Sequence, residues 1–194
     1  LYVGDIGDND RKRPEIIVYR VAEPAINADD AKSSKAAPRV TDAAAVIRLI
    51  YPDGPHDAET LLVHPTSGDL YIVIKTSQKT SKLYRAKAPL STSTTTTLEF
   101  VADVRVPAVF AGLITGGDIS PDGHRVVLCD YAAAYELRLD EHATNFDDVW
   151  GQTPAVVSLG ERLQGESVCY SLDGSSIFAT SEKTPTPLIE VKHN

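Results

Sequence analysis

The chain has 194 residues, of which 42% are hydrophobic and 24% are charged, as in a globular protein with a substantial core. Its formal net charge is −8 and no basic stripe is visible, which argues against nucleic-acid binding because nucleic-acid binders need a basic face. No apolar run approaches the roughly 18 residues of a membrane-spanning helix. We therefore expect neither a nucleic-acid partner nor a membrane span.

The N-terminal part of the chain predicts three strands and a long polar loop. The chain contains no methionine and opens inside the apolar run Leu1-Tyr2-Val3, so we expect further polypeptide to precede Leu1 in the whole protein. Residues 1–5, 18–21 and 45–50 have the short apolar pattern of strands. Residues 27–42 are polar and predict a surface insertion, in which residues 28–35 would form a turn or two of helix.

The rest of the chain repeats a unit of strand, tight turn and strand. The turns end in Gly68, Gly123 and Gly174, each preceded by Ser or Asp, which suits a hairpin turn that needs a positive φ. The strands expected on either side of the turns are 60–64 and 70–74, 117–120 and 125–129, and 168–171 and 176–180. Fourth strands are expected at 98–106 and 155–159, after a Ser/Thr-rich loop at 90–97 and a second connection.

A third strand of each unit carries one recurrent tyrosine or isoleucine. The four positions are Tyr19, Tyr84, Tyr135 and Ile189, which are 51 to 65 residues apart. A period near 40–50 residues, stretched by loops, is typical of β-propeller blades. We predict an all-β fold, a β-propeller of four-stranded antiparallel blades. The expected domain is 1–194, truncated at its N-terminus, with blade segments at about 1–52, 57–106, 114–160 and 165–194, and would form an incomplete arc of about four blades.

Smaller features fit this arrangement. The repeated tyrosines are expected to pack between blades. The glycine-rich stretch at Gly116 and Gly117 precedes a strand, so it predicts close backbone packing around the channel and not a phosphate site. The cysteines Cys129 and Cys169 have no metal-binding spacing. We expect two small buried residues; a disulfide between neighbouring blades is the alternative.

Four segments together resemble a group of bacterial, exported β-propeller proteins without an established activity. The segments are Tyr2-Val3-Gly4-Asp5-Ile6-Gly7-Asp8-Asn9, Tyr51-Pro52-Asp53-Gly54-Pro55-His56-Asp57-Ala58-Glu59, Thr115-Gly116-Gly117-Asp118-Ile119-Ser120-Pro121-Asp122-Gly123 and Gln164-Gly165-Glu166-Ser167. The resemblance implies a periplasmic or extracellular location. In architecture the chain is more distantly similar to gluconolactonase-type lactonases, β-propeller phytases and quinoprotein sugar dehydrogenases, a likeness of fold and not of chemistry.

The predicted blades bring several polar side chains to one end of the channel. Counting back from the turns, Glu59, Thr115 and Glu166 are equivalent positions at the start of the innermost strand. The loops that leave the second strands should add further ligand-binding candidates on the same face. These are Lys75, Asp130 and Glu182, with Asp5 and Asp8 from the first blade. We expect an acidic channel mouth that binds a small molecule or a protein partner.

Three interpretations of the mouth stay open from the sequence. Calcium prefers several carboxylate and carbonyl oxygens, so Glu59, Glu166, Asp5 and Asp8 are candidate metal ligands and Ca²⁺ is a candidate cofactor. A carboxylate near such an ion would act as a general base, which makes a metal-dependent hydrolase of lactonase or phosphoesterase type the alternative to a binding module. In the third interpretation Glu59 and Glu166 accept hydrogen bonds from backbone amides of the neighbouring blade and only hold the ring together.

Overall fold

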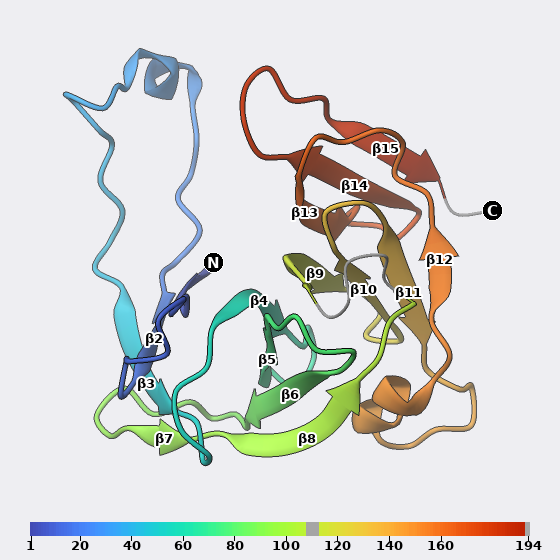
Figure 1. Cartoon of the computed structure of the whole chain (residues 1–194). Coiled ribbons are helices and arrows are strands. Elements are labelled where there is room, and N and C mark those ends of the chain that lie inside the picture. Colours follow the sequence, from blue (N-terminus) through green and yellow to red (C-terminus); the bar gives the residue numbers. More distant parts are fainter. Residues whose placement is uncertain (108–112, 193–194) are drawn as a thin grey trace.

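The computed structural model describes residues 1–107 and 113–192, which form four small β-sheets that follow one another around a common centre (Figure 1). Within each sheet, strands that follow one another in the chain pair antiparallel. The predicted fold class is confirmed: the structure is all-β and its sheets are arranged as the blades of a propeller. Two short 3₁₀ helices, η1 (Ala28–Lys32) and η2 (Phe146–Gly151), are the helical elements of the described residues.

The strands of the first two sheets have the following bounds. The first sheet contains β1 (Tyr2–Asp5), β2 (Ile16–Arg20), β3 (Ala45–Ile50) and β7 (Thr96–Thr97). The second contains β4 (Ala58–Val63), β5 (Leu70–Ile74), β6 (Ser81–Ala86) and β8 (Glu99–Val104). In both sheets the strands are given from the channel outward.

The other two sheets continue the pattern. The third contains β9 (Gly116–Ile119), β10 (Arg125–Cys129), β11 (Ala134–Arg138) and β12 (Ala155–Val157). The fourth contains β13 (Gly165–Tyr170), β14 (Ser176–Ser181) and β15 (Ile189–Lys192). The innermost strand β9 contacts both β4 and β13, so successive blades meet along the channel. Apolar side chains fill the space between neighbouring sheets in three clusters.

The three hairpin turns have the geometry that their glycines predicted. Gly68, Gly123 and Gly174 have φ values of 75°, 72° and 70°, in the left-handed region that favours glycine. In the first of these turns the N–H of Gly68 donates to the carbonyl of His64 at 2.9 Å. The turns therefore set the register between the first and second strands of each blade.

Two of the recurrent tyrosines, Tyr84 and Tyr135, pack between blades as predicted, whereas Tyr19 is only partly buried and belongs to none of the three apolar clusters. Tyr84 lies in a cluster with side chains of the first sheet, and Tyr135 in a cluster with side chains of the second. Both are fully buried, and each hydroxyl donates to an aspartate, Asp53 for Tyr84 and Asp130 for Tyr135. Burial of a large ring with its hydroxyl satisfied fixes one blade against the next.

Three details differ from the sequence predictions. Part of the polar loop at 90–97 forms β7, which pairs parallel with β3 and adds a fourth strand to the first sheet. The helix η2, which contains the aromatic residues Phe146 and Trp150, was not predicted from the sequence. Neither cysteine is in a disulfide, and Cys129 is buried but Cys169 is exposed. Cys169 lies on the opposite face of β13 from the apolar cluster that buries Val168 and Tyr170.

In the described part of the chain, we find no helix with the length and apolarity needed to cross a membrane.

Candidate functional site

Three side chains from three successive blades line one hollow at the channel mouth. Glu59 comes from β4, Glu166 from β13, and Thr115 directly precedes β9. The hollow has a volume of about 470 Å³ and is closed on another side by Tyr2 and Gly4 of β1. The structure thus places the three residues around one space, and their role as ligand-binding residues stays a prediction.

Glu59 and Glu166 occupy the same irregularity in their strands. In the β4–β5 pair the register shifts between Ala58 and Thr60, and in the β13–β14 pair it shifts between Gly165 and Ser167. Each glutamate is therefore the extra residue of a β-bulge. Bulges bend a strand and redirect a side chain, and they are frequent beside functional sites. The two bulges give both carboxylates the same position in their blades.

Glu59 forms an ion pair with Lys75. The Lys75 Nζ lies 2.8 Å from the Glu59 Oε2, and the side chains are 15% and 34% exposed, respectively. Lys75 also lies over the ring of Tyr131 from the third blade, 5.2 Å from its centroid. Burial opposes the charge of Lys75, but its interactions with Glu59 and Tyr131 together outweigh burial and raise the pKa of Lys75. One carboxylate of the mouth thus has a cationic partner.

Among the described residues, no lysine forms an ion pair with Glu166. Its Oε1 accepts a hydrogen bond from the Gln164 Nε2 at 2.8 Å. Burial is the main reason that the pKa of Glu166 is raised, and the nearby charges of Glu59 and Glu182 raise it further. The mouth is therefore an environment in which a second negative charge is unfavourable.

The substitution Glu166→Gln should stabilise the fold at neutral pH. A carboxyl whose pKa is raised in the folded state binds protons more readily when folded, so its ionisation reduces stability as pH rises. The gain should be below about 1 kcal/mol, because the side chain is partly solvated. It should disappear below pH 4.5, the ordinary value for this group. Urea unfolding at neutral pH and below pH 4.5 measures this gain, and Glu23→Gln in the β2–β3 connection is the control. An equal gain at both pH values would contradict a raised pKa of Glu166.

Hydrogen bonds between blades come from residues other than the two glutamates. The Thr115 hydroxyl donates to the Gly165 carbonyl of the next blade at 2.8 Å. The Asp118 carboxylate accepts from the Tyr170 N–H at 2.9 Å, also across the third and fourth blades. Thr115 is buried, so its hydroxyl supports the wall of the hollow. In these contacts Thr115 and Asp118 perform the structural role that the sequence offered for Glu59 and Glu166.

Asp130 and Glu182 differ in accessibility. Asp130 is fully buried, and its carboxylate accepts from the Ala132 and Ala133 N–H groups at 2.8 Å and from the Tyr135 hydroxyl at 2.7 Å. These three donors give Asp130 a structural role in its turn. Glu182 is exposed next to the mouth, and its charge acts on Glu166.

Asp5 and Asp8 are held by Arg13. The Arg13 guanidinium donates to the Asp5 carboxylate at 2.7 Å, and the Arg13 N–H donates to the Asp8 carboxylate at 2.7 Å. Burial would raise the pKa of Asp8, but hydrogen bonds from the N–H groups of residues 11–13 and the positive charge of Arg13 together outweigh burial and lower that pKa. Across residues 1–107 and 113–192, no three His, Cys, Asp or Glu side chains converge as a set of metal ligands. The calcium site stays a prediction.

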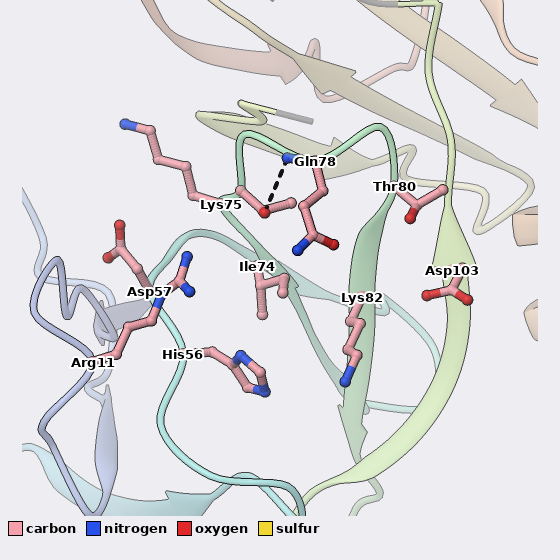
Figure 2. A pocket seen from close by; sticks show the side chains of 10 residues that line it. Arg11, His56, Asp57, Ile74, Lys75, Gln78, Thr80, Lys82 and Asp103 are labelled. Atoms are coloured by element: carbon pink, nitrogen blue, oxygen red, sulfur yellow. Dashed lines mark hydrogen bonds between the residues drawn. The ribbon is translucent and has the colours of Figure 1, made fainter. Parts of the chain in front are cut away.

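A second, smaller pocket lies between the first two blades on the same face. It has a volume of about 190 Å³ and is walled by the loop after β5 and by the connection between β3 and β4. Figure 2 shows Arg11 and Asp57 on one side of the pocket and Thr80 and Asp103 on the other. Lys75 belongs to its lining and reaches Glu59 of the larger hollow, so the two spaces share one wall.

Asp53 organises the floor beside this pocket. Its carboxylate accepts hydrogen bonds from Lys82 and from the Tyr84 hydroxyl, and His56 Nε2 lies 2.9 Å away. Burial would raise the pKa of Asp53, but these hydrogen bonds outweigh burial and lower that pKa. Sequence reasoning named neither Lys82 nor this cluster. The sequence feature that could have indicated this cluster is the segment from Tyr51 to Glu59, which contains Asp53 and His56. Both lysines of the pocket are paired with acids, Lys75 with Glu59 and Lys82 with Asp53, so we place the candidate site at the larger hollow.

Comparisons with known proteins support the fold. No family model matches the chain, and no curated protein matches it. A chain in the crystal structure of a nidogen/laminin complex is similar with a TM-score of 0.56 at 8% identity, over 98% of this chain and 57% of that one. A chain of Kuenenia stuttgartiensis hydrazine synthase is similar with a TM-score of 0.52 at 12% identity, over 93% and 56%. The chain thus spans a little over half the length of these structures, and at such identities the likeness shows fold alone.

Proposed function

We propose that this chain is a non-catalytic β-propeller binding module whose channel mouth accepts a cationic group of a small molecule or protein partner. One observation carries the proposal: Glu59 and Glu166 sit on equivalent β-bulges of two blades and line one open hollow with Thr115. Two carboxylates that face one space attract a positive charge. Lys75 balances only one of them.

The state of Glu166 supports the same conclusion. Its raised pKa results from burial and from repulsion by Glu59 and Glu182, and a bound cation would relieve that repulsion. Ammonium and guanidinium groups form short hydrogen bonds with carboxylates, which gives direction as well as attraction. One propeller of similar fold belongs to a nidogen/laminin complex, in keeping with an interaction role.

Calcium is the inorganic alternative, and the metal-dependent hydrolase depends on it. A calcium ion takes six to eight oxygen ligands. Glu59 and Glu166 would supply two carboxylates, and the rest would have to come from backbone carbonyls and water. We therefore favour an organic cation, and the experiment below separates the two ligands.

The test is a titration of the protein with two probes, in which backbone amide chemical shifts report binding. The first probe is the tripeptide acetyl-Gly-Lys-Gly-amide, and the second is calcium chloride. We expect the tripeptide to shift signals around Glu59, Thr115 and Glu166. Glu59→Gln and Glu166→Gln should each weaken binding about fivefold, since a partly exposed ion pair contributes up to about 1 kcal/mol. Glu23→Gln, in the β2–β3 connection, is the matched control. Saturable binding of calcium but not of the tripeptide would contradict the proposal.

A further inference from the structure

The smaller pocket between the first two blades has a set of charges of its own. Its walls come from the β1–β2 connection, the β3–β4 connection, the loop after β5, and the strands β6 and β8. Pockets for drug-sized ligands measure about 300–1,000 Å³, so this pocket of about 190 Å³ suits a smaller molecule. Its two lysines already pair with acids, and the charged side chains that remain in its lining are Arg11, Asp57 and Asp103.

A fixed loop holds Arg11 at one wall of the pocket. The φ of Arg11 is 54°, in the left-handed region that is uncommon for a residue with a side chain. Its N–H donates to the Asp8 carbonyl at 2.8 Å, and the Asp8 N–H donates to the Asp57 carboxylate at 2.7 Å. The second bond fastens the loop to the β3–β4 connection. Strained backbone of this kind is concentrated at functional sites and ligand clamps.

Arg11 is also the cation of this loop that has no acid partner. Lys12 pairs with Asp10 at 3.0 Å, and Arg13 pairs with Asp5 at 2.7 Å. In the part of the chain that the structure describes, no carboxylate lies within ion-pair distance of the Arg11 guanidinium. Arg11 is exposed, so an anion in the pocket can reach it.

Asp103 is an unpaired acid on the opposite wall. It lies opposite Lys82 in the β6–β8 pair, a position at which opposite charges commonly interact. The Lys82 side chain instead donates to Asp53 in the floor. Across residues 1–107 and 113–192, Asp103 forms no ion pair. Figure 2 shows it with Thr80 on the side of the pocket that faces away from Arg11.

An apolar centre separates the two unpaired charges. Ile74, the last residue of β5, lies between Arg11 on one side of the pocket and Asp103 on the other (Figure 2). The Asp57 carboxylate points away from Ile74 in the same view, and it already accepts the N–H of Asp8. The lining thus fits a molecule with an anionic end, an apolar middle and a cationic end.

We propose that this pocket binds a small linear zwitterion of the ω-amino acid class, with its carboxylate on Arg11 and its terminal ammonium on Asp103. A guanidinium binds a carboxylate through two parallel hydrogen bonds, and an ammonium forms short charge-assisted hydrogen bonds with a carboxylate. The methylene chain between the two groups covers Ile74 and removes apolar surface from water. This site is separate from the channel mouth, and it goes beyond the recognition of a cationic group there.

The test is a titration of the whole chain with 4-aminobutanoate, 5-aminopentanoate and 6-aminohexanoate, in which backbone amide chemical shifts report binding. The tightest of the three is then compared with the carboxylate and the amine of the same chain length, each of which keeps one charge. We expect the zwitterion to bind at least about fivefold more tightly than either, because only the zwitterion contacts both walls. Signals of Arg11, Ile74 and Asp103 should shift. Equal affinity for the zwitterion and a single-charge probe would overturn the proposal, as would no binding of any zwitterion.

Substitutions on the two walls separate this site from the channel mouth. Arg11→Gln and Asp103→Asn should each weaken binding of the zwitterion about fivefold. Arg11→Gln should leave binding of the amine unchanged, and Asp103→Asn should leave binding of the carboxylate unchanged. The controls are Lys12→Gln on the same loop and Glu166→Gln at the mouth, which should change affinity less than about twofold. An equal loss in Glu166→Gln would place the ligand at the mouth and overturn the site, and unchanged binding in both wall variants would also overturn it.

Discussion

Asp147→Ala should lower the free energy of unfolding by about 3 kcal/mol. Asp147 lies in η2 and accepts a hydrogen bond from the Tyr71 hydroxyl at 2.8 Å and another from the Arg85 guanidinium. The Arg85 and Asp147 side chains are 14% and 18% exposed, and Tyr71 is buried. Removal of the Asp147 carboxylate leaves Arg85 with the more exposed Glu99 as its remaining acid partner, and it deprives the buried Tyr71 hydroxyl of this acceptor.

The cost should appear in urea unfolding as a lower midpoint with an unchanged slope. The neighbouring Asp148 is exposed and provides the control, since Asp148→Ala should change stability by less than about 0.5 kcal/mol. Phe146 and Trp150 flank the same network, and the Tyr71 ring lies 5.4 Å and 5.8 Å from theirs. If Asp147→Ala cost no more than Asp148→Ala, the network would not fasten η2 to the second sheet.

Gly116→Ala should destabilise the fold by about 2 to 3 kcal/mol and weaken binding at the mouth. A Cβ at Gly116 would lie 2.7 Å from the backbone oxygen of Glu166 and 3.4 Å from the Cys129 Sγ. A backbone carbonyl cannot rotate away as a side-chain end can, so β9 and β13 must separate. Overpacking of this kind costs about 1–3 kcal/mol. Because the displaced carbonyl belongs to Glu166, the tripeptide should also bind less tightly.

Gly151→Ala is the matched control for this substitution. An added Cβ at Gly151 meets no atom within 4 Å, and the residue is exposed. Its free energy of unfolding should stay within about 0.5 kcal/mol of the original chain. A Gly116→Ala variant as stable as Gly151→Ala would show that β9 and β13 do not approach as closely as described.

The repeat made the architecture predictable from the sequence. The turn glycines and the recurrent tyrosines fixed which segments pair, and three predicted strands coincide with β3, β5 and β10. Close packing at Gly116 and Gly117 was also predicted and is confirmed, since a Cβ at Gly117 would lie 2.7 Å from the Val127 carbonyl oxygen. Such features depend on local turn chemistry and on side-chain periodicity, both of which a single sequence contains.

The features that define the site depend on contacts between distant residues. Nothing in the sequence indicates that Glu59 and Glu166 sit on bulges, because a bulge is a property of two strands and not of one. The strand β7 forms because Thr96 and Thr97 pair with the outer edge of β3. A Ser/Thr-rich segment by itself does not predict that pairing.

The most direct test of the account compares charge recognition in two proteins. The probes are acetyl-Gly-Lys-Gly-amide and the same peptide acetylated on its lysine, which removes only the positive charge. The proteins are the original chain and the double variant Glu59→Gln/Glu166→Gln. We expect the original chain to prefer the charged peptide by at least about tenfold and the double variant to bind both peptides equally weakly. Equal affinity of the original chain for both peptides would contradict the claim that its mouth recognises a cation.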